Sequence, residues 1–174
     1  MLLAASVLAD IDILIPGLEH RGPTHSIILL TLLLTPALIR YRRKAIPYYV
    51  ALIQHPLIGD FLTGGEGIQL LWPITTDSYG LGICMETLVS VSLEWALFIG
   101  CIATMLKTKD AQILLQSHQS NLILALPAAA LLLPMLFGFP WHIPPELIIP
   151  HLTYLAIFTI SILKDLITIL KKTE

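Results

Sequence analysis

The sequence predicts an all-α membrane protein: a polytopic bundle of about five transmembrane helices, preceded by a short, broken N-terminal helix. Hydrophobic residues make up 56% of the 174-residue chain, charged residues only 13%, and the mean hydropathy is +0.82. Soluble domains carry about 25% charged residues, so this chain has too few polar groups to cover a water-exposed surface. The length suits a single membrane-embedded domain over residues 1–174.

Six apolar runs define the expected helices. They are 1–16, 26–39, 45–58, 81–106, 121–139 and 147–163. A helix that crosses a bilayer needs about 20 residues, with a range near 17–25, and the last three runs meet this requirement. The second and third runs are shorter and fit a helical hairpin whose ends are shielded by protein or by snorkelling basic side chains. The first run contains two aspartates and is expected to be a partial or broken span.

Lysine and arginine predict the orientation, because these residues gather on the cytoplasmic side of membrane proteins. With the basic turn Arg40–Lys44 placed inside, the later spans also bring Lys107, Lys109 and the C-terminal lysines inside. Nine of the ten basic residues then share one side. The chain is therefore expected to be a multi-pass protein of the cytoplasmic (cell) membrane, with its other polar clusters facing the extracytoplasmic side.

Aspartates and histidines from three distant segments are expected to meet at the extracytoplasmic face. Each residue alone is most simply solvated or anchored at the interface, but a solvated rim has no reason to prefer His and Asp over Lys, Asn or Ser. Carboxylate oxygens with imidazole nitrogens suit Zn²⁺ or another divalent ion such as Mn²⁺ or Fe²⁺. The expected ligands of one or two ions are Asp10, Asp12, His20, His25, His55 and Asp60.

Local signals place two of these histidines near helix ends. Thr24 is a suitable N-cap for the following helix, which would put His25 and Ser26 in its first turn. Backbone amides there favour a bound anion. Pro56 is expected to push His55 away from regular helix geometry, which would aim its ring inward.

Glu86, Ser90 and Glu94 form a polar stripe with helical spacing along the run at 81–106. An ionised carboxylate near the bilayer centre costs at least about 2.5–3.5 kcal/mol, so the stripe is expected to face the interior of the bundle. Two interpretations of Glu86 stay open. It is either an additional metal ligand or general base, or a group that forms a hydrogen bond between helices.

The order of these motifs resembles the YdjM-like family. The match consists of Asp-Ile-Asp, His-Arg-Gly-x-Thr-His-Ser, a His…Asp pair and Leu-Leu-Trp-Pro, and it runs from Asp10 to Pro73. Members are described as membrane-embedded metal-dependent hydrolases and as LexA-binding inner-membrane proteins, with a distant similarity to zinc-dependent phospholipases C. The family commonly has His-x-x-x-Asp, whereas four residues, including a proline, separate His55 from Asp60.

The residues and the resemblance together predict a membrane-bound metal-dependent hydrolase, a phosphoesterase acting on a lipid or lipid-linked substrate at the extracytoplasmic face. A divalent metal, zinc first, would activate water, with Arg21 and Glu86 as catalytic residues. Arg21, Thr24 and Ser26 would bind the substrate phosphate. The expected partners are the lipid bilayer and the phosphoester substrate, with no directly bound nucleic acid. Two alternatives stay open: a regulatory or scaffold membrane protein with a structural metal, and an ion-coupled transporter.

Overall fold

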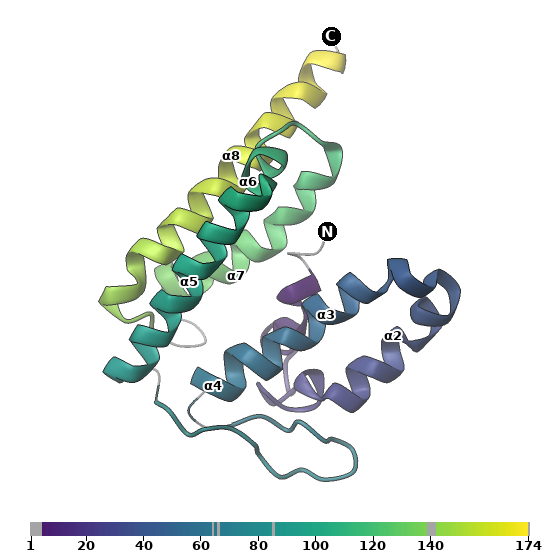
Figure 1. Cartoon of the computed structure of the whole chain (residues 1–174), viewed down its shortest axis with the longest axis vertical. Helices are drawn as coiled ribbons and strands as arrows, with labels where there is room; N and C mark the ends of the chain where they lie inside the picture. The colour runs from purple at the N-terminus through teal and green to yellow at the C-terminus, as the bar shows by residue number, and fades with distance from the viewer. Residues whose placement is uncertain (1–4, 64, 66, 85, 139–141, 174) are drawn as a thin grey trace. The chain divides into compact units, whose positions relative to one another are not determined.

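The computed structural model of the chain describes residues 5–63, 65, 67–84, 86–138 and 142–173 (Figure 1). Its regular elements are helices, and within these residues the β-type pairing is an isolated bridge between Ile68 and Tyr79. The prediction of an all-α fold is therefore confirmed. The chain divides into two compact units, Leu2–Ser90 and Val91–Glu174. The expectation of one domain over residues 1–174 stays a prediction.

The unit Leu2–Ser90 consists of short helical segments around a helical hairpin. Its elements are η1 (Leu8–Leu14), η2 (Pro23–His25), α2 (Ile27–Tyr41), η3 (Arg42–Lys44), α3 (Ile46–Gln54), η4 (His55–Asp60) and α4 (Phe61–Thr63). Helices α2 and α3 pack against each other (Figure 1), and the hydroxyls of Thr31 and Tyr49 form a hydrogen bond of 2.9 Å between them. The N-cap of α2 is Ser26, whose hydroxyl accepts a hydrogen bond from the Leu29 amide. The prediction that Thr24 caps this helix is therefore wrong.

The segment that follows α4 returns to the beginning of α2. The Ile27 amide donates a hydrogen bond of 3.1 Å to the Leu70 carbonyl, and the Gln69 amide donates one of 3.0 Å to the Arg21 carbonyl. These contacts join residues that lie more than forty positions apart in the chain. They hold the backbone between η1 and α2 in place.

Three apolar helices form most of the unit Val91–Glu174 (Figure 1). Its elements are α5 (Leu88–Thr108), which begins just before the unit, α6 (Asp110–Leu114), η5 (Gln119–Leu124), α7 (Ala125–Phe137), η6 (Pro145–Leu147) and α8 (Ile148–Thr173). Helix α8 packs against α7 and η5, and the ring centroids of Phe98 in α5 and Tyr154 in α8 are 5.4 Å apart. The buried carboxylate of Asp165 accepts hydrogen bonds from the Ser117 hydroxyl and the His118 amide. These bonds fix the turn between α6 and η5 against α8.

The number of potential membrane spans differs from the prediction. Among the described residues, two helices are long and apolar enough to cross a membrane, Leu88–Thr108 and Pro145–Lys171, while a shorter apolar helix covers Asn121–Phe137. The structure thus corrects about five expected spans to two. Helices α2 and α3 have 15 and 9 residues. At 1.5 Å per residue they are about 22 Å and 14 Å long, shorter than the roughly 30 Å hydrocarbon core.

The start of α5 also differs from the prediction. The helix begins at Leu88, because the Thr87 hydroxyl accepts a hydrogen bond from the Ser90 amide, as an N-cap residue does. Glu86 therefore lies in the turn before the helix, where it is exposed, whereas Ser90 is buried. The predicted stripe from Glu86 to Glu94 is accordingly not one continuous helical face.

Candidate metal centre

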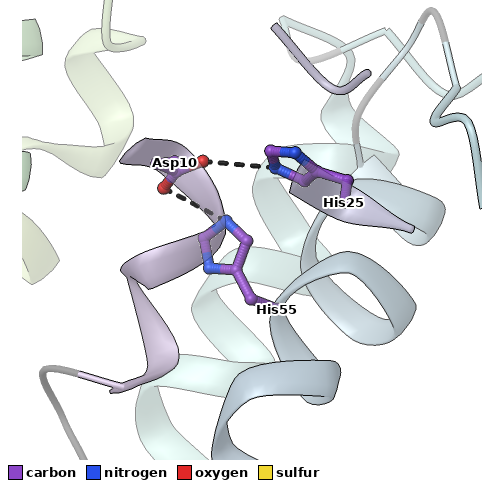
Figure 2. Close-up of side chains that lie close together, drawn as sticks. All are labelled: Asp10, His25 and His55. Carbon is purple, nitrogen blue, oxygen red and sulfur yellow. Dashed lines mark ion pairs between the residues drawn. The ribbon is translucent and has the colours of Figure 1, made fainter. Parts of the chain in front are cut away.

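Side chains from η1, η2 and η4 meet in one group, here called the Asp–His cluster. The cluster consists of Asp10 and Asp12 of η1, His20 and Arg21 of the following turn, Thr24 and His25 of η2, and His55 and Asp60 of η4. Figure 2 shows Asp10 between the imidazole rings of His25 and His55, with one carboxylate oxygen directed toward each ring. All six predicted metal ligands therefore lie close together.

His25 and His55 occupy the centre of the cluster. His25 Nε2 lies 3.4 Å from Asp10 Oδ1 and 3.3 Å from Asp60 Oδ2. His55 Nε2 lies 3.2 Å from Asp10 Oδ2 and 3.5 Å from Asp60 Oδ2. In a tetrahedral zinc site with bonds of about 2.0–2.1 Å, neighbouring ligand atoms are separated by about 3.3–3.4 Å. The observed separations are thus of the size expected between ligands of a common ion.

Two buried atoms of the cluster, His25 Nε2 and Asp60 Oδ2, form an ion pair at 3.3 Å that lacks hydrogen-bond geometry. His25 is fully buried and Asp60 is 7% exposed. Within the described part of the chain, neither His25 Nε2 nor Asp60 Oδ2 has a hydrogen-bond partner. Buried polar atoms nearly always have one, because an unsatisfied group costs about 1–3 kcal/mol. A cation bound by both atoms would remove this cost, so the residues present fit a divalent metal.

Asp12 orients the ring of His25. Its Oδ2 accepts hydrogen bonds from the Thr24 hydroxyl, at 2.7 Å, and from the Arg21 amide, at 3.1 Å. The same oxygen lies 3.3 Å from His25 Nδ1. A carboxylate beside one ring nitrogen fixes the tautomer and directs the other nitrogen toward a metal, as in carboxylate–histidine–zinc arrangements. Asp12 is therefore placed to support His25 and leaves its Nε2 facing Asp10 and Asp60.

The spacing of His55 and Asp60 is explained by a π-helix. Element η4 has this geometry, and the amide of Phe61 bonds to the carbonyl of Pro56, five residues earlier. Since π-helical hydrogen bonds join residues i and i+5, His55 and Asp60 lie on the same side of the turn. The sequence predicted that Pro56 would push His55 away from regular helix, and the regular α-helix does end at Gln54 and give way to the π-helix at His55. The backbone of His55 itself stays helical, with φ −58° and ψ −61°, and the chain passes from α3 into the π-helix without a break.

The backbone beside the cluster adopts an unusual conformation at Arg21. Its φ of +64° lies in the left-handed region, which residues other than glycine rarely adopt. The conformation is held from both sides, because the Arg21 amide donates to Asp12 and its carbonyl accepts from Gln69. The next residue must be small, since a Cβ on Gly22 would lie 2.8 Å from the Glu19 carbonyl oxygen. This local geometry carries the chain from η1 into η2.

The side chains predicted to bind substrate are placed in different ways. Arg21 Nε lies 3.4 Å from Asp60 Oδ1, and both side chains are 9% exposed. Ser26 is fully buried, and its hydroxyl donates a hydrogen bond of 2.5 Å to the Trp72 carbonyl. The structure thus places Arg21 in the cluster and uses Ser26 to attach the segment after α4.

Glu86, the other predicted catalytic residue, lies outside the cluster. It is exposed in the turn before α5, and no hydrogen bond or ion pair found among the described residues joins it to the Asp–His cluster. Two other residues, Gln69 and Trp72, hold the Arg21 and Ser26 region through backbone contacts; Trp72 belongs to the Leu-Leu-Trp-Pro motif of the resemblance, but this contact was not predicted for either residue. Backbone contacts of this kind leave no signal in side-chain type.

The opposite charges within the cluster shift the pKa values of its aspartates and histidines. Burial by itself raises the pKa of Asp10 and Asp12, but contacts with the histidines outweigh it and hold both values well below the ordinary 3.8. Burial lowers the pKa of His25, yet Asp10, Asp12 and Asp60 together raise it to about 11. Burial also lowers the pKa of His55, but Asp10 and, to a smaller extent, Asp60 outweigh it, so that this pKa is raised as well. Without a metal, a proton on the His25 imidazole therefore offsets part of the carboxylate charge.

One side of the cluster is open. The side chains of Asp10, His20 and His55 are 20%, 24% and 25% exposed, whereas those of Asp12 and His25 are fully buried. Catalytic zinc sites keep one position open for water or substrate, while structural zinc sites are closed by four protein ligands. The exposure pattern is thus that of a site that solutes can reach.

Comparison with known proteins identifies the family. No curated protein and no solved structure matches the chain. The family model of the YdjM inner membrane protein matches residues 1–143. This match covers the whole Asp–His cluster and extends well beyond the motifs between Asp10 and Pro73 that suggested the resemblance. The two long apolar helices agree with a membrane location, and the chain belongs to the YdjM inner membrane protein family.

Proposed function

We propose that this protein is a membrane-bound metal-dependent hydrolase that cleaves a phosphoester bond in a lipid or lipid-linked substrate. The observation that supports it most is the meeting of His25 Nε2 and His55 Nε2 with carboxylate oxygens of Asp10 and Asp60, at 3.2–3.5 Å. The proposed cofactor is a divalent ion, zinc first, with manganese and iron as alternatives for this oxygen and nitrogen donor set.

The residues of the cluster divide the work of such a site. Asp10, His25, His55 and Asp60 hold the ion, and Asp12 keeps His25 Nδ1 engaged so that Nε2 faces inward. A divalent ion in this position lowers the pKa of a water ligand toward about 7 and polarises a phosphoryl oxygen. The exposed edges of Asp10 and His55 mark the side from which water and substrate approach.

The charges of the cluster can be balanced by one divalent ion, and the guanidinium of Arg21 is suited to an anionic substrate. With neutral imidazoles, the three carboxylates and the Arg21 guanidinium carry a net charge of −2, which one divalent ion neutralises. Guanidinium geometry suits phosphate oxygens, and we propose that Arg21, now beside Asp60, contacts the substrate phosphate. The geometry adds no support to the roles predicted for Glu86, Thr24 and Ser26 in catalysis or substrate binding, and the proposal does not depend on them.

Apolar side chains next to the cluster support a lipid or lipid-linked substrate. Leu8 and Ile11 of η1 are 47% and 42% exposed, and Leu57 and Ile58 of η4 are 37% and 44% exposed. Ile11 lies between Asp10 and Asp12 in the sequence, and Leu57 and Ile58 lie between His55 and Asp60. A substrate with a phosphate head and an apolar tail would contact both kinds of group.

A multi-pass arrangement in the cytoplasmic membrane is part of the proposal. Few residues of α5 and α8 are buried within the protein, and their exposed leucines and isoleucines suit a lipid environment. We propose that local thinning of the bilayer accommodates the short hairpin of α2 and α3, so that the basic side chains of η3 snorkel to the cytoplasmic surface. The cluster, at the other end of the hairpin, then faces the extracytoplasmic side, in keeping with the cytoplasmic preference of the basic residues in η3.

The partial exposure of the cluster favours a hydrolase over a scaffold with a structural metal. A structural zinc site is closed by its four protein ligands, whereas Asp10 and His55 retain exposed edges. Removal of the metal also has different expected effects on the fold and on turnover for the two functions. A scaffold would lose its fold on chelation, while a hydrolase would lose turnover first.

The test combines metal analysis with turnover. Detergent-purified wild-type protein, Asp10→Ala and His55→Ala are assayed for bound metal and for hydrolysis of a panel of phosphomonoesters, phosphodiesters and phospholipids. His118→Gln, which changes an exposed histidine outside the cluster, is the matched control. We expect stoichiometric metal and turnover in the wild type and control, and loss of both in the two cluster variants. Stoichiometric metal without turnover on any substrate would contradict the hydrolase, and full metal retention in both variants would contradict the site.

A further inference from the structure

A second group of possible metal ligands adjoins the first. Asp10, His25 and His55 each offer one ligand atom, and these atoms lie within 4.8 Å of one another. Asp10, Asp12 and His20 satisfy the same condition. Asp10 belongs to both groups, and each of its carboxylate oxygens has two lone pairs, so that an oxygen bound to one ion can bridge to a second.

The two oxygens of Asp12 differ in their surroundings. Oδ2 accepts hydrogen bonds from Thr24 and Arg21 and lies beside His25, so its acceptor capacity is used within the protein. Oδ1 forms a hydrogen bond of 3.1 Å with His20 Nδ1 in the ion-free protein, and this separation is also close to that of two ligands of one ion. Each carboxylate oxygen has two lone pairs, and Oδ1 therefore retains a donor position for a cation.

His20 has a position suited to an exchangeable ligand. Its side chain is 24% exposed while that of Asp12 is fully buried, so this second group also has one side open to solvent. The rings of His20 and His25 meet edge to face, with 5.5 Å between centroids. The two imidazoles thus belong to adjacent groups on either side of Asp12.

We propose that the cluster holds two divalent cations bridged by Asp10, the second of them bound by Asp12 Oδ1 and His20 Nδ1. This inference rests on the proposed function, and it adds a reason, from the charge of the site, why the substrate is a phosphate ester. With both ions bound, the net charge of the cluster changes from −2 to +2, which attracts a phosphate ester rather than a neutral carboxylic ester. Paired metals about 3.5–4 Å apart are a recurring arrangement in phosphoester hydrolysis, where they act on both the attacking and the leaving oxygen.

The first test is the number of bound ions. Wild-type protein, His20→Ala, His20→Asp and the control His118→Gln are purified in detergent, stripped with chelator, reloaded with Mn²⁺ and freed of loose metal. We expect two equivalents of manganese in the wild type and control, and one in His20→Ala. His20→Asp should restore the second equivalent, because an aspartate oxygen and the histidine Nδ1 are the same number of bonds from the backbone.

The second test asks whether the ions are bridged. The electron paramagnetic resonance spectrum of two manganese ions joined by a carboxylate shows exchange coupling, while a single ion gives an isolated six-line signal. We expect coupling in the wild type and His20→Asp, and the isolated signal in His20→Ala. Thermal unfolding of each variant establishes that the fold is kept, since a partly exposed histidine tolerates substitution.

The outcomes separate this inference from the proposed function. One equivalent of manganese in the wild type, or two in His20→Ala, would overturn the second site and would show that His20 and Asp12 share only a hydrogen bond. Turnover with a single bound ion would then leave the hydrolase intact. Two coupled ions without hydrolysis of any phosphoester would support the second site and contradict the proposed function.

Discussion

His55 Nε2 and Asp60 Oδ2 lie 3.5 Å apart although four residues separate them in the sequence. On an α-helix, side chains three or four positions apart are neighbours, and a pair five positions apart diverges. The π-helix of η4 removes this problem, because its wider turn brings positions i and i+5 together. The extra residue relative to the His-x-x-x-Asp spacing common in the family is thus accommodated by the helix type.

Deletion of Ile58 should therefore preserve the metal centre. Ile58 is 44% exposed, and its removal leaves the histidine and the aspartate four positions apart, which suits an α-helical turn. We expect wild-type metal content by elemental analysis of the purified protein. Insertion of an alanine after Ile58 is the comparison, because six positions turn the aspartate away, and metal should be lost. A deletion variant that melts like the wild type but binds no metal would contradict the role of the π-helix.

A second prediction concerns the hydroxyl of Thr24. It donates a hydrogen bond of 2.7 Å to the fully buried carboxylate of Asp12, and a hydrogen bond to a charged group contributes about 1.5–3 kcal/mol. Thr24→Val should lower the free energy of unfolding by about that amount, measured by denaturant unfolding in detergent with chelator present. Thr24→Ser keeps the donor and should stay close to the wild type. Equal stability of the valine and serine variants would show that this hydrogen bond contributes little.

A third prediction compares two glycines of the same unit. A Cβ on Gly22 would lie 2.8 Å from the Glu19 carbonyl oxygen, whereas a Cβ on Gly59 meets nothing within 4 Å. Forced overpacking costs about 1–3 kcal/mol, while alanine in a helix is favoured over glycine by about 0.5–1 kcal/mol. Gly22→Ala should lower the melting temperature and the metal affinity, and Gly59→Ala should leave both unchanged or slightly higher. A Gly22→Ala protein with wild-type affinity would mean that the turn adjusts freely.

The sequence predicted the composition of the site better than its geometry. Asp10, Asp12, His25 and His55 stand out because ionisable residues are rare in so apolar a chain, and such residues gather where they share a function. The task of Asp12 Oδ2 was not predictable, since the sequence does not show which carboxylate oxygen orients a histidine and which is left for a metal. Only the distances to Thr24 and His25 separate the two roles.

The fold class followed from composition, but helix lengths did not. Hydropathy measures where a run is apolar and does not locate the residue at which a helix ends. The run at 81–106 was predicted as one helix, yet the Thr87 cap starts α5 only at Leu88. The hairpin helices end at η3, where Arg42 has φ +47° and breaks the helical path. Local backbone conformation thus decided the number of long helices.

A fourth prediction concerns pH. In ion-free protein the pKa of His25 is raised from 6.5 to about 11. Between these values the folded state binds more protons than the unfolded state. The stability that His25 contributes is therefore fully present below pH 6.5 and is lost as pH rises toward 11. A bound metal requires a deprotonated imidazole, and stability of the loaded protein should rise up to about pH 6.5 and then level off.

The measurement is the melting temperature with zinc and with chelator, from pH 6 to pH 9. The difference between the two should grow as pH rises, because the ion-free protein loses stability while the loaded protein does not. The His55→Ala protein should show a much smaller difference, since it lacks one ligand. A difference that does not change with pH would contradict metal binding by the buried His25.

The most direct test of the account is X-ray absorption spectroscopy at the zinc edge of the loaded, detergent-purified protein. We predict nitrogen and oxygen ligands at about 2.0–2.1 Å, with the multiple-scattering pattern of imidazole rings that weakens in His55→Ala. Absence of tightly bound zinc, or a sulfur ligand at about 2.3 Å supplied by Cys84 or Cys101, would contradict a metal centre built from Asp10, His25, His55 and Asp60.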